Sequence, residues 1–165
     1  MCSRICSART SVFCLVSSIK EGNLFLGIDV GATKTHALVC DEQGLLLGFG
    51  NGPGGNPETE GYTGLAQAMQ TAWQEASHQA GIGKEQIEAA GFGIAGYDWP
   101  FQYMQTLESV KILGLSSERL RIENDAVPPI YAGTTHGWGI AACVGTGNNV
   151  DRKSTRLNSS HRIRS

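Results

Sequence analysis

Apolar runs and amphipathic segments alternate along residues 24–150 in a pattern that predicts a mixed α/β domain. Three short apolar runs joined by tight connections come first, which is typical of an antiparallel meander. Helix-like and strand-like segments then alternate. The predicted strands are 24–30, 35–40, 45–49, 87–95, 120–123 and 139–144. The order β-β-β-α-β-α-β-α-β predicts a mixed sheet with covering helices.

Helical spacing of apolar residues predicts the helices. The first follows a Gly- and Pro-rich loop at 51–61 and ends at Gly81. Its apolar face comprises Leu65, Met69, Ala72, Trp73 and Ala76. The second is predicted to start with Asp98 as its cap, and its inner face to comprise Phe101, Met104, Leu107 and Val110. The third is predicted to open at Asn124 and Asp125.

Composition and charge indicate a globular protein with an acidic body. Hydrophobic residues make up 41% of the 165 residues and charged residues 17%. Five of the 13 basic residues lie in 151–165, and the rest of the chain holds 8 basic and 14 acidic residues. A nucleic-acid surface would need clustered Lys and Arg, so none is expected. No membrane span is expected either, because no apolar run reaches about 18 residues, and the cytoplasm is the default expectation.

Cysteine usage does not indicate a disulfide framework, because the count of five is odd and the spacings show no pairing pattern. Cys40 and Cys143 lie in strand-like runs and are predicted to be small core residues.

Both ends of the chain depart from the pattern of the body. Residues 1–22 are interpreted as a non-conforming extension, since their apolar run is too short for a signal peptide. Residues 151–165 contain only two apolar positions, and the back-translation of 151–161 is similar to a short-read sequencing adapter. We therefore hypothesise that 151–165 is an artefactual tail on a domain at 23–150. The genomic sequence would refute this by encoding the same tail.

Two turns of small residues at strand ends are candidate phosphate-binding elements. In the first, backbone N–H groups near Gly31 can approach phosphate oxygens, Thr33 adds a hydroxyl and Lys34 a cation. Asp29, just before it, is a carboxylate of the kind that binds hydrated Mg²⁺. The second turn consists of Gly145, Thr146 and Gly147, followed by Asn148 and Asn149. Ordinary hairpin turns would look the same.

Three further positions are candidates for catalysis or sugar binding. Asp125 lies at a strand–helix junction, where a carboxylate can accept a hydroxyl proton during phosphoryl transfer. Taken alone, the residue is better explained as a helix cap, whereas the order of the other motifs favours the base. Asn56, in a stiff loop, can offer an amide to sugar hydroxyls, unless the loop is only a linker. In the segment 93–99, small residues permit close ligand approach and Trp99 can lie beside a sugar ring or in the core.

The ordered set DVGATKT, GPGGNP, GIAGYD, NDA and GTGNN resembles the N-acetylglucosamine kinases and the wider BadF/BadG/BcrA/BcrD ATPase family. The resemblance spans residues 24–150 and implies one lobe of an actin-like, ribonuclease-H-like ATPase fold, truncated before its second lobe. It implies that the whole enzyme transfers phosphate from ATP, with Mg²⁺, to N-acetylglucosamine, giving the 6-phosphate. It also allows for a homodimer, and the truncated chain is expected to be inactive.

The resemblance also implies roles for individual residues. Thr33 and Thr146 correspond to contacts with ATP phosphates, and Asp125 to the catalytic base. Asn56 corresponds to a sugar-binding asparagine, and Asn148 and Asn149 fall where further substrate contacts are expected.

Three other functions remain open. One is an ATPase activator of a 2-hydroxyacyl-CoA dehydratase, which would carry an iron–sulfur cluster on cysteines. The others are a sugar-sensing module without catalysis and a glucokinase-like enzyme, which the DVGATK run alone would also suit.

Overall fold

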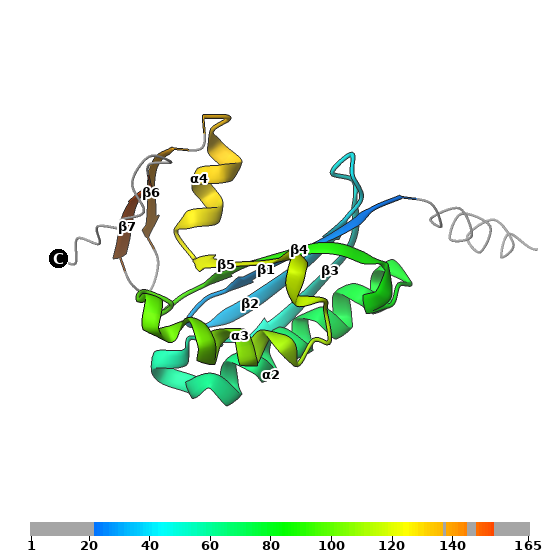
Figure 1. Cartoon of the computed structure of the whole chain (residues 1–165), viewed down its shortest axis with the longest axis horizontal. Helices are drawn as coiled ribbons and strands as arrows, with labels where there is room; N and C mark the ends of the chain where they lie inside the picture. Colours follow the sequence, from blue (N-terminus) through cyan, green and yellow to red (C-terminus); the bar gives the residue numbers. More distant parts are fainter. Residues whose placement is uncertain (1–21, 137, 145–147, 154–165) are drawn as a thin grey trace, which may run out of the picture.

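A five-stranded mixed sheet forms the centre of the protein. The computed structural model describes residues 22–136, 138–144 and 148–153 (Figure 1). The strands are β1 (Leu24–Val30), β2 (Lys34–Cys40), β3 (Leu46–Pro53), β4 (Ile87–Ile94) and β5 (Leu120–Asn124), in the spatial order β3-β2-β1-β4-β5. The pairs β1–β2 and β2–β3 are antiparallel, whereas β1–β4 and β4–β5 are parallel. This confirms the predicted meander and mixed sheet.

Helices lie on both sides of the sheet. α2 (Pro57–Ala80) and α3 (Tyr103–Lys111) cover one face, and α4 (Val127–Gly133) stands on the other side beside a separate hairpin of β6 (Gly139–Val144) and β7 (Asn148–Lys153) (Figure 1). Short 3₁₀ turns at Lys84–Gln86, Pro100–Gln102 and Ser117–Arg119 lead into β4, α3 and β5. None of the helices in the described part of the chain could span a membrane.

The core lies between the sheet and α2. Alternate residues of the strands point into it, because successive side chains of a strand lie on opposite faces. The buried strand residues are Leu24, Leu26, Ile28, Val30, Ala37, Val39, Ala90, Phe92 and Ile94. All five predicted apolar positions of the first helix are buried against them. Each large apolar side chain buried in this way contributes about 1.5–3 kcal/mol.

Glycines of β3 allow α2 to pack directly on the strand. Gly48, Gly50 and Gly52 face a row of alanines four residues apart, Ala68, Ala72 and Ala76. A Cβ atom at any of these glycines would overlap a backbone carbonyl oxygen of α2. The prediction of a loop from residue 51 is therefore wrong for residues 51–53, which continue β3. Here the alternating glycines allow the backbones of β3 and α2 to approach closely, and they do not form a turn.

Side chains of α2 also accept hydrogen bonds from the outer edge of β3. Gln79 Oε1 accepts a hydrogen bond from the Phe49 backbone N–H at 2.9 Å, and Glu75 Oε2 accepts one from the Asn51 N–H at 2.7 Å. These N–H groups point away from β2, so the helix satisfies donors that an edge strand usually leaves open.

The first helix begins earlier than predicted. α2 starts at Pro57, with Asn56 as its N-cap, and proline is favoured in the first turn because its missing N–H would have no helical partner. Gly61, with φ 68° and ψ 175°, interrupts the helix after that turn. The predicted end at Gly81 is confirmed, since this residue adopts the left-handed conformation at the C-cap.

The inner face predicted for the second helix is wrong at two positions, one in the 3₁₀ turn at Pro100–Gln102 and one in α3. Phe101 and Met104 are 78% and 62% exposed, and Leu107 is only half-buried. The residues of α3 that are buried are Thr106, Ser109 and Val110. The Ser109 hydroxyl donates to the Tyr62 carbonyl of α2 at 3.1 Å, and the Thr106 hydroxyl bonds the preceding helical turn. Hydroxyl groups satisfied in this way can be buried, which apolar spacing alone does not reveal.

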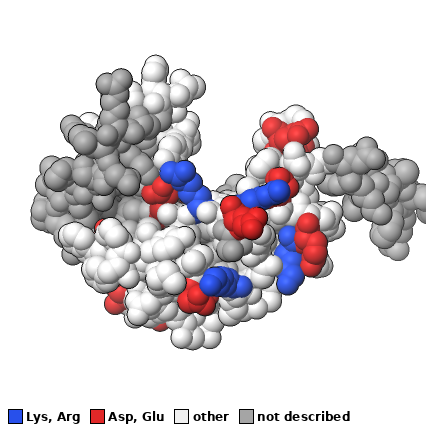
Figure 2. All heavy atoms as spheres, viewed as in Figure 1, with Lys and Arg blue, Asp and Glu red and all other residues white. Residues whose placement is uncertain are grey.

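Within the described part of the chain, the second face of the sheet carries exposed side chains such as those of Asp29 and Leu38. Figure 2 shows a hollow on this side, between α4 and the β2–β3 turn.

Cys40 is half-buried on this second face of the sheet, so its predicted place in the core is wrong. Its neighbour Val39 lies on the core face instead. Burial and the neighbouring Asp41 raise the pKa of the Cys40 thiol. The Cys143 side chain lies outside the described residues.

Candidate functional site

Four of the five sequence motifs meet at one edge of the sheet. The parallel strands β1, β4 and β5 all end there, β2 starts there and β3 ends there. Backbone hydrogen bonds join the turns: the Gly55 N–H donates to the Gly31 carbonyl at 3.1 Å, and the Ala95 N–H donates to the Val30 carbonyl at 2.9 Å. Ligands of open α/β sheets bind at this carboxyl edge, which makes it the candidate site.

The β1–β2 turn is a tight hairpin closed by a backbone hydrogen bond. The Gly31 N–H donates to the Lys34 carbonyl at 2.9 Å, and the side chains of Thr33 and Lys34 are exposed. Gly54 packs against the turn so closely that a Cβ atom there would overlap the Ala32 carbonyl oxygen. The β3–α2 loop therefore supports the turn and leaves its polar side chains open to a ligand.

Asp29 is the residue before the end of β1 and lies beside two basic groups. It pairs with His36 across the antiparallel ladder, and Lys34 is also near. Although the residue is exposed, burial of the carboxyl group raises its pKa, and His36 and Lys34 oppose that shift. Within the described residues no group of three or more His, Cys, Asp or Glu could hold a metal. A single carboxylate fits Mg²⁺, which retains waters and also binds substrate phosphates.

The Asp29→Asn variant is expected to be slightly more stable than the wild type at neutral pH. A carboxyl group with a raised pKa in the folded state favours folding when protonated, and this contribution is lost as pH rises through the folded-state pKa. The amide does not ionise, so the difference should shrink as pH falls toward the unfolded-state pKa of about 3.9 and vanish well below it, where both states of the wild type are protonated. Thermal unfolding between pH 3 and pH 8 measures this, and a stability difference that is independent of pH would contradict it.

Asn56 caps α2 and also packs against the loop after β4. Its Oδ1 accepts a hydrogen bond from the Glu58 N–H at 2.8 Å and so caps α2. Gly96, at φ 80°, packs against this amide, and a Cβ atom there would overlap Asn56 Oδ1. The capping bond uses the amide oxygen, so the Nδ2 group is the part of Asn56 that can serve a ligand.

The predicted caps at Asp98 and Asp125 are not observed. Ala126 is the N-cap of α4 and Trp99 that of the turn before α3, and neither of these residues caps its helix through its own side chain. Asp98 instead accepts a hydrogen bond from Asn124 Nδ2 at 2.9 Å. Asp125 is half-buried, with Oδ1 shielded from solvent, at the junction of β5 and α4. The geometry thus removes the capping explanation for Asp125.

Trp99 is not a core residue, because it is 61% exposed beside the site.

Gln102 is a residue of the site that sequence reasoning missed. Its Oε1 accepts hydrogen bonds from the N–H groups of Asp98 and Trp99, both at 2.8 Å, and its Nε2 donates to the Gly96 carbonyl at 3.0 Å. A glutamine two residues after Pro100, in the position that a capping box uses, was the available signal.

Several predicted positions lie outside the described residues. Gly145, Thr146 and Gly147 fall in the gap between β6 and β7. Asn148 and Asn149 begin β7, but their side chains are not described. Most of the predicted extension at 1–22 and of the predicted tail at 151–165 is likewise outside.

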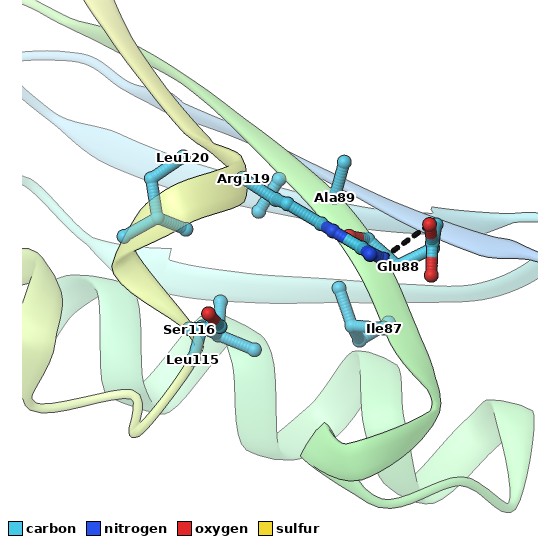
Figure 3. Close-up of a pocket in the computed structure, with 8 residues that line it drawn as sticks. Ile87, Glu88, Ala89, Leu115, Ser116, Arg119 and Leu120 are labelled. Atoms are coloured by element: carbon cyan, nitrogen blue, oxygen red, sulfur yellow. Dashed lines mark hydrogen bonds and ion pairs between the residues drawn. The ribbon is translucent and has the colours of Figure 1, made fainter.

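A shallow pocket at the opposite edge of the sheet is separate from this site (Figure 3). It lies where β4 and β5 begin, between Ile87 and Leu120, and the Arg119–Glu88 ion pair crosses it. None of the sequence motifs contributes to it.

Comparisons with solved structures match this fold. A provisionally assigned N-acetylglucosamine kinase from Porphyromonas gingivalis has a TM-score of 0.64 and 23% identity, over 86% of this chain and 47% of its own. Another, from Chromobacterium violaceum, has a TM-score of 0.63 and 19% identity, over 85% and 48%. A ROK family glucokinase from Streptomyces griseus, in complex with glucose and AMPPNP, has a TM-score of 0.55 and 27% identity, over 86% and 47%.

These matches show that the fold is that of the actin-like ATPases, and that the chain spans about half the length of each matched kinase. No curated protein matches the sequence. Residues 26–152 match the BadF/BadG/BcrA/BcrD ATPase family, close to the 24–150 expected from the motifs. The chain belongs to the BadF/BadG/BcrA/BcrD ATPase family.

Proposed function

We propose that the full-length protein uses ATP to phosphorylate an amino sugar, with N-acetylglucosamine converted to its 6-phosphate as the best candidate reaction. One observation carries this: the β1–β2 turn, Asn56 and Asp125 come from three separate segments and lie along one edge of the sheet. Phosphoryl transfer depends mainly on positioning a donor, an acceptor and a base together. The 165-residue chain alone is expected to lack activity, because it spans about half the length of each matched kinase.

The donor side of the site is formed by the β1–β2 turn. Backbone N–H groups near Gly31, the Thr33 hydroxyl and the Lys34 ammonium group would bind the ATP phosphates, with Gly145, Thr146 and Gly147 as a second contact. Asp29 would hold Mg²⁺, which neutralises the negative charge of the phosphates.

The acceptor side is formed by Asn56 and Asp125, with Asn148 and Asn149 as further sugar contacts. Asp125 would accept the proton of the sugar hydroxyl as that oxygen bonds to the γ-phosphorus. The bond from the γ-phosphorus to the bridging oxygen breaks, and ADP leaves with that oxygen. The resemblance of the motifs to N-acetylglucosamine kinases supports an amino sugar as the acceptor, and a solved relative binds glucose.

Expression of the full-length genomic reading frame provides the test. ADP release from ATP and Mg²⁺ should depend on added N-acetylglucosamine, and should be slower with glucose or N-acetylmannosamine. NMR of the product should show phosphate on the C6 oxygen. ATP hydrolysis that no sugar stimulates, together with an iron–sulfur absorption spectrum, would instead identify a dehydratase activator. Sugar binding without turnover would identify a sensing module.

A further inference from the structure

We infer that Asn124 is a positioning residue that fixes Asp125 relative to the sugar-binding amide of Asn56. The inference rests on the proposed function, in which Asp125 is the base. Asn124 ends β5 immediately before Asp125 and lies opposite Ile94 in the parallel ladder. It therefore joins the end of β5, which leads into Asp125, to the end of β4, which leads into the loop that packs on Asn56.

The amide of Asn124 makes three hydrogen bonds. Its Nδ2 group donates to the Tyr97 carbonyl at 3.2 Å and to Asp98 Oδ1 at 2.9 Å, and its Oδ1 accepts from the Ala126 N–H at 3.0 Å. The orientation of the amide follows from chemistry, because the Ala126 N–H needs an acceptor and the Tyr97 carbonyl needs a donor. Both Nδ2 hydrogens are used and Oδ1 already accepts one bond, so these bonds tie Asn124 to its neighbours, and we infer that it acts through them.

The bond to Ala126 spans Asp125 and closes a turn around it. On its other side, Asp125 lies against β4: a Cβ atom at Gly93 would come within 3.5 Å of the Asp125 Cα and 2.8 Å of Pro128 Cγ. The backbone of Asp125 is therefore held between the turn that the Asn124–Ala126 bond closes and β4, which has no side chain at Gly93.

The partners of Asn124 extend the connection to the other side of the site. Gln102 holds the loop that contains Asp98, and Gly96 in the same loop packs on the Asn56 amide. The loop thus links Asn56 to Asn124, and Asn124 links it to Asp125. Removing the Asn124 amide would let the base shift relative to the sugar.

The test uses four variants of the full-length protein: Asn124→Ala, Asn124→Asp, Asp125→Asn and a control, Asn23→Asp. Asn23 is exposed and lies before β1, at the opposite edge of the sheet. Asn124→Ala should lower kcat about 10- to 100-fold, the scale of a misplacement of about 1 Å. Its KM for the sugar should stay within about twofold, because no sugar contact is removed. Thermal unfolding should show that each variant is folded.

Asn124→Asp separates positioning from folding through its pH profile. The new carboxylate still accepts from the Ala126 N–H but repels Asp98 at neutral pH. At lower pH the two carboxyl groups can share a proton, which restores a hydrogen bond between them. The kcat deficit relative to the wild type should therefore shrink as pH falls, whereas Asn23→Asp should follow the wild type throughout.

The outcomes distinguish this inference from the proposed function. A full-length wild type without sugar-kinase activity would overturn both. An active wild type with an inactive Asp125→Asn variant, but an Asn124→Ala variant with normal kcat, would overturn the inference alone. A large rise in the sugar KM with little change in kcat would also overturn it, because it would make Asn124 a direct sugar contact.

Discussion

Replacing Asp125 by Asn should lower kcat for sugar phosphorylation about 10²- to 10⁴-fold, which is the usual contribution of a general base. Asparagine has nearly the same shape but cannot accept the hydroxyl proton. Asp125 is half-buried at the β5–α4 junction and is not the N-cap of α4, so the change does not remove a cap of that helix. Steady-state ADP release by the full-length protein, with N-acetylglucosamine as acceptor, measures the effect.

A matched carboxylate-to-amide change provides the control. Glu85 is exposed in the 3₁₀ turn before β4, at the opposite edge of the sheet, so Glu85→Gln should retain wild-type kcat. ATP affinity of Asp125→Asn should be unchanged, because the phosphate turn is a separate segment. An Asp125→Asn variant with kcat within a few-fold of the wild type would remove Asp125 from the mechanism.

Gly50→Ala should destabilise the protein by about 1–3 kcal/mol or more, the cost of overpacking a core. The added methyl group would overlap the Ala72 carbonyl oxygen and approach the Ala76 backbone nitrogen to 2.7 Å. Both atoms belong to the helix backbone, so no side-chain rotation can relieve the contact. The midpoint of urea-induced unfolding, followed by circular dichroism, should fall accordingly.

Gly27→Ala is the matched control for this change. Gly27 also lies within a strand of the sheet, but a Cβ atom there meets nothing within 4 Å because it points to the open face. Its midpoint should stay near that of the wild type or rise slightly, since alanine restricts the unfolded chain. Equal losses in the two variants would show that helix contact at Gly50 is not the cause.

Periodicity located the strands and the first helix because burial follows it closely there. β1 was predicted at its observed bounds, and every predicted apolar position of α2 is buried. It failed where glycine and hydroxyl residues are buried. The part of β3 from residue 51 to Pro53, which includes Gly52, looks like a loop in the sequence, and Thr106 and Ser109 look polar. In the structure Gly52 packs on α2, and the two hydroxyl residues are buried.

The candidate site could be predicted as a set of residues but not as a network. Asp29, Asn56 and Asp125 could be selected from the sequence because a carboxylate or an amide at a strand end or in a loop is a candidate for binding or catalysis. The hydrogen bonds of Asn124 and Gln102 depend on how the β4–α3 loop folds back, and that is a tertiary property. The second phosphate turn at 145–147 remains a prediction from the motif alone.

The bonds from Glu75 and Gln79 to the edge of β3 bear on how the protein can aggregate. A strand from another chain adds to a sheet by pairing with open backbone donors, and α2 already occupies two of those on β3. Of the two margins of the described sheet, β5 is thus the one at which strand addition would begin. Variants that weaken α2 should open the β3 margin as well, so loss of stability and gain of aggregation should occur together.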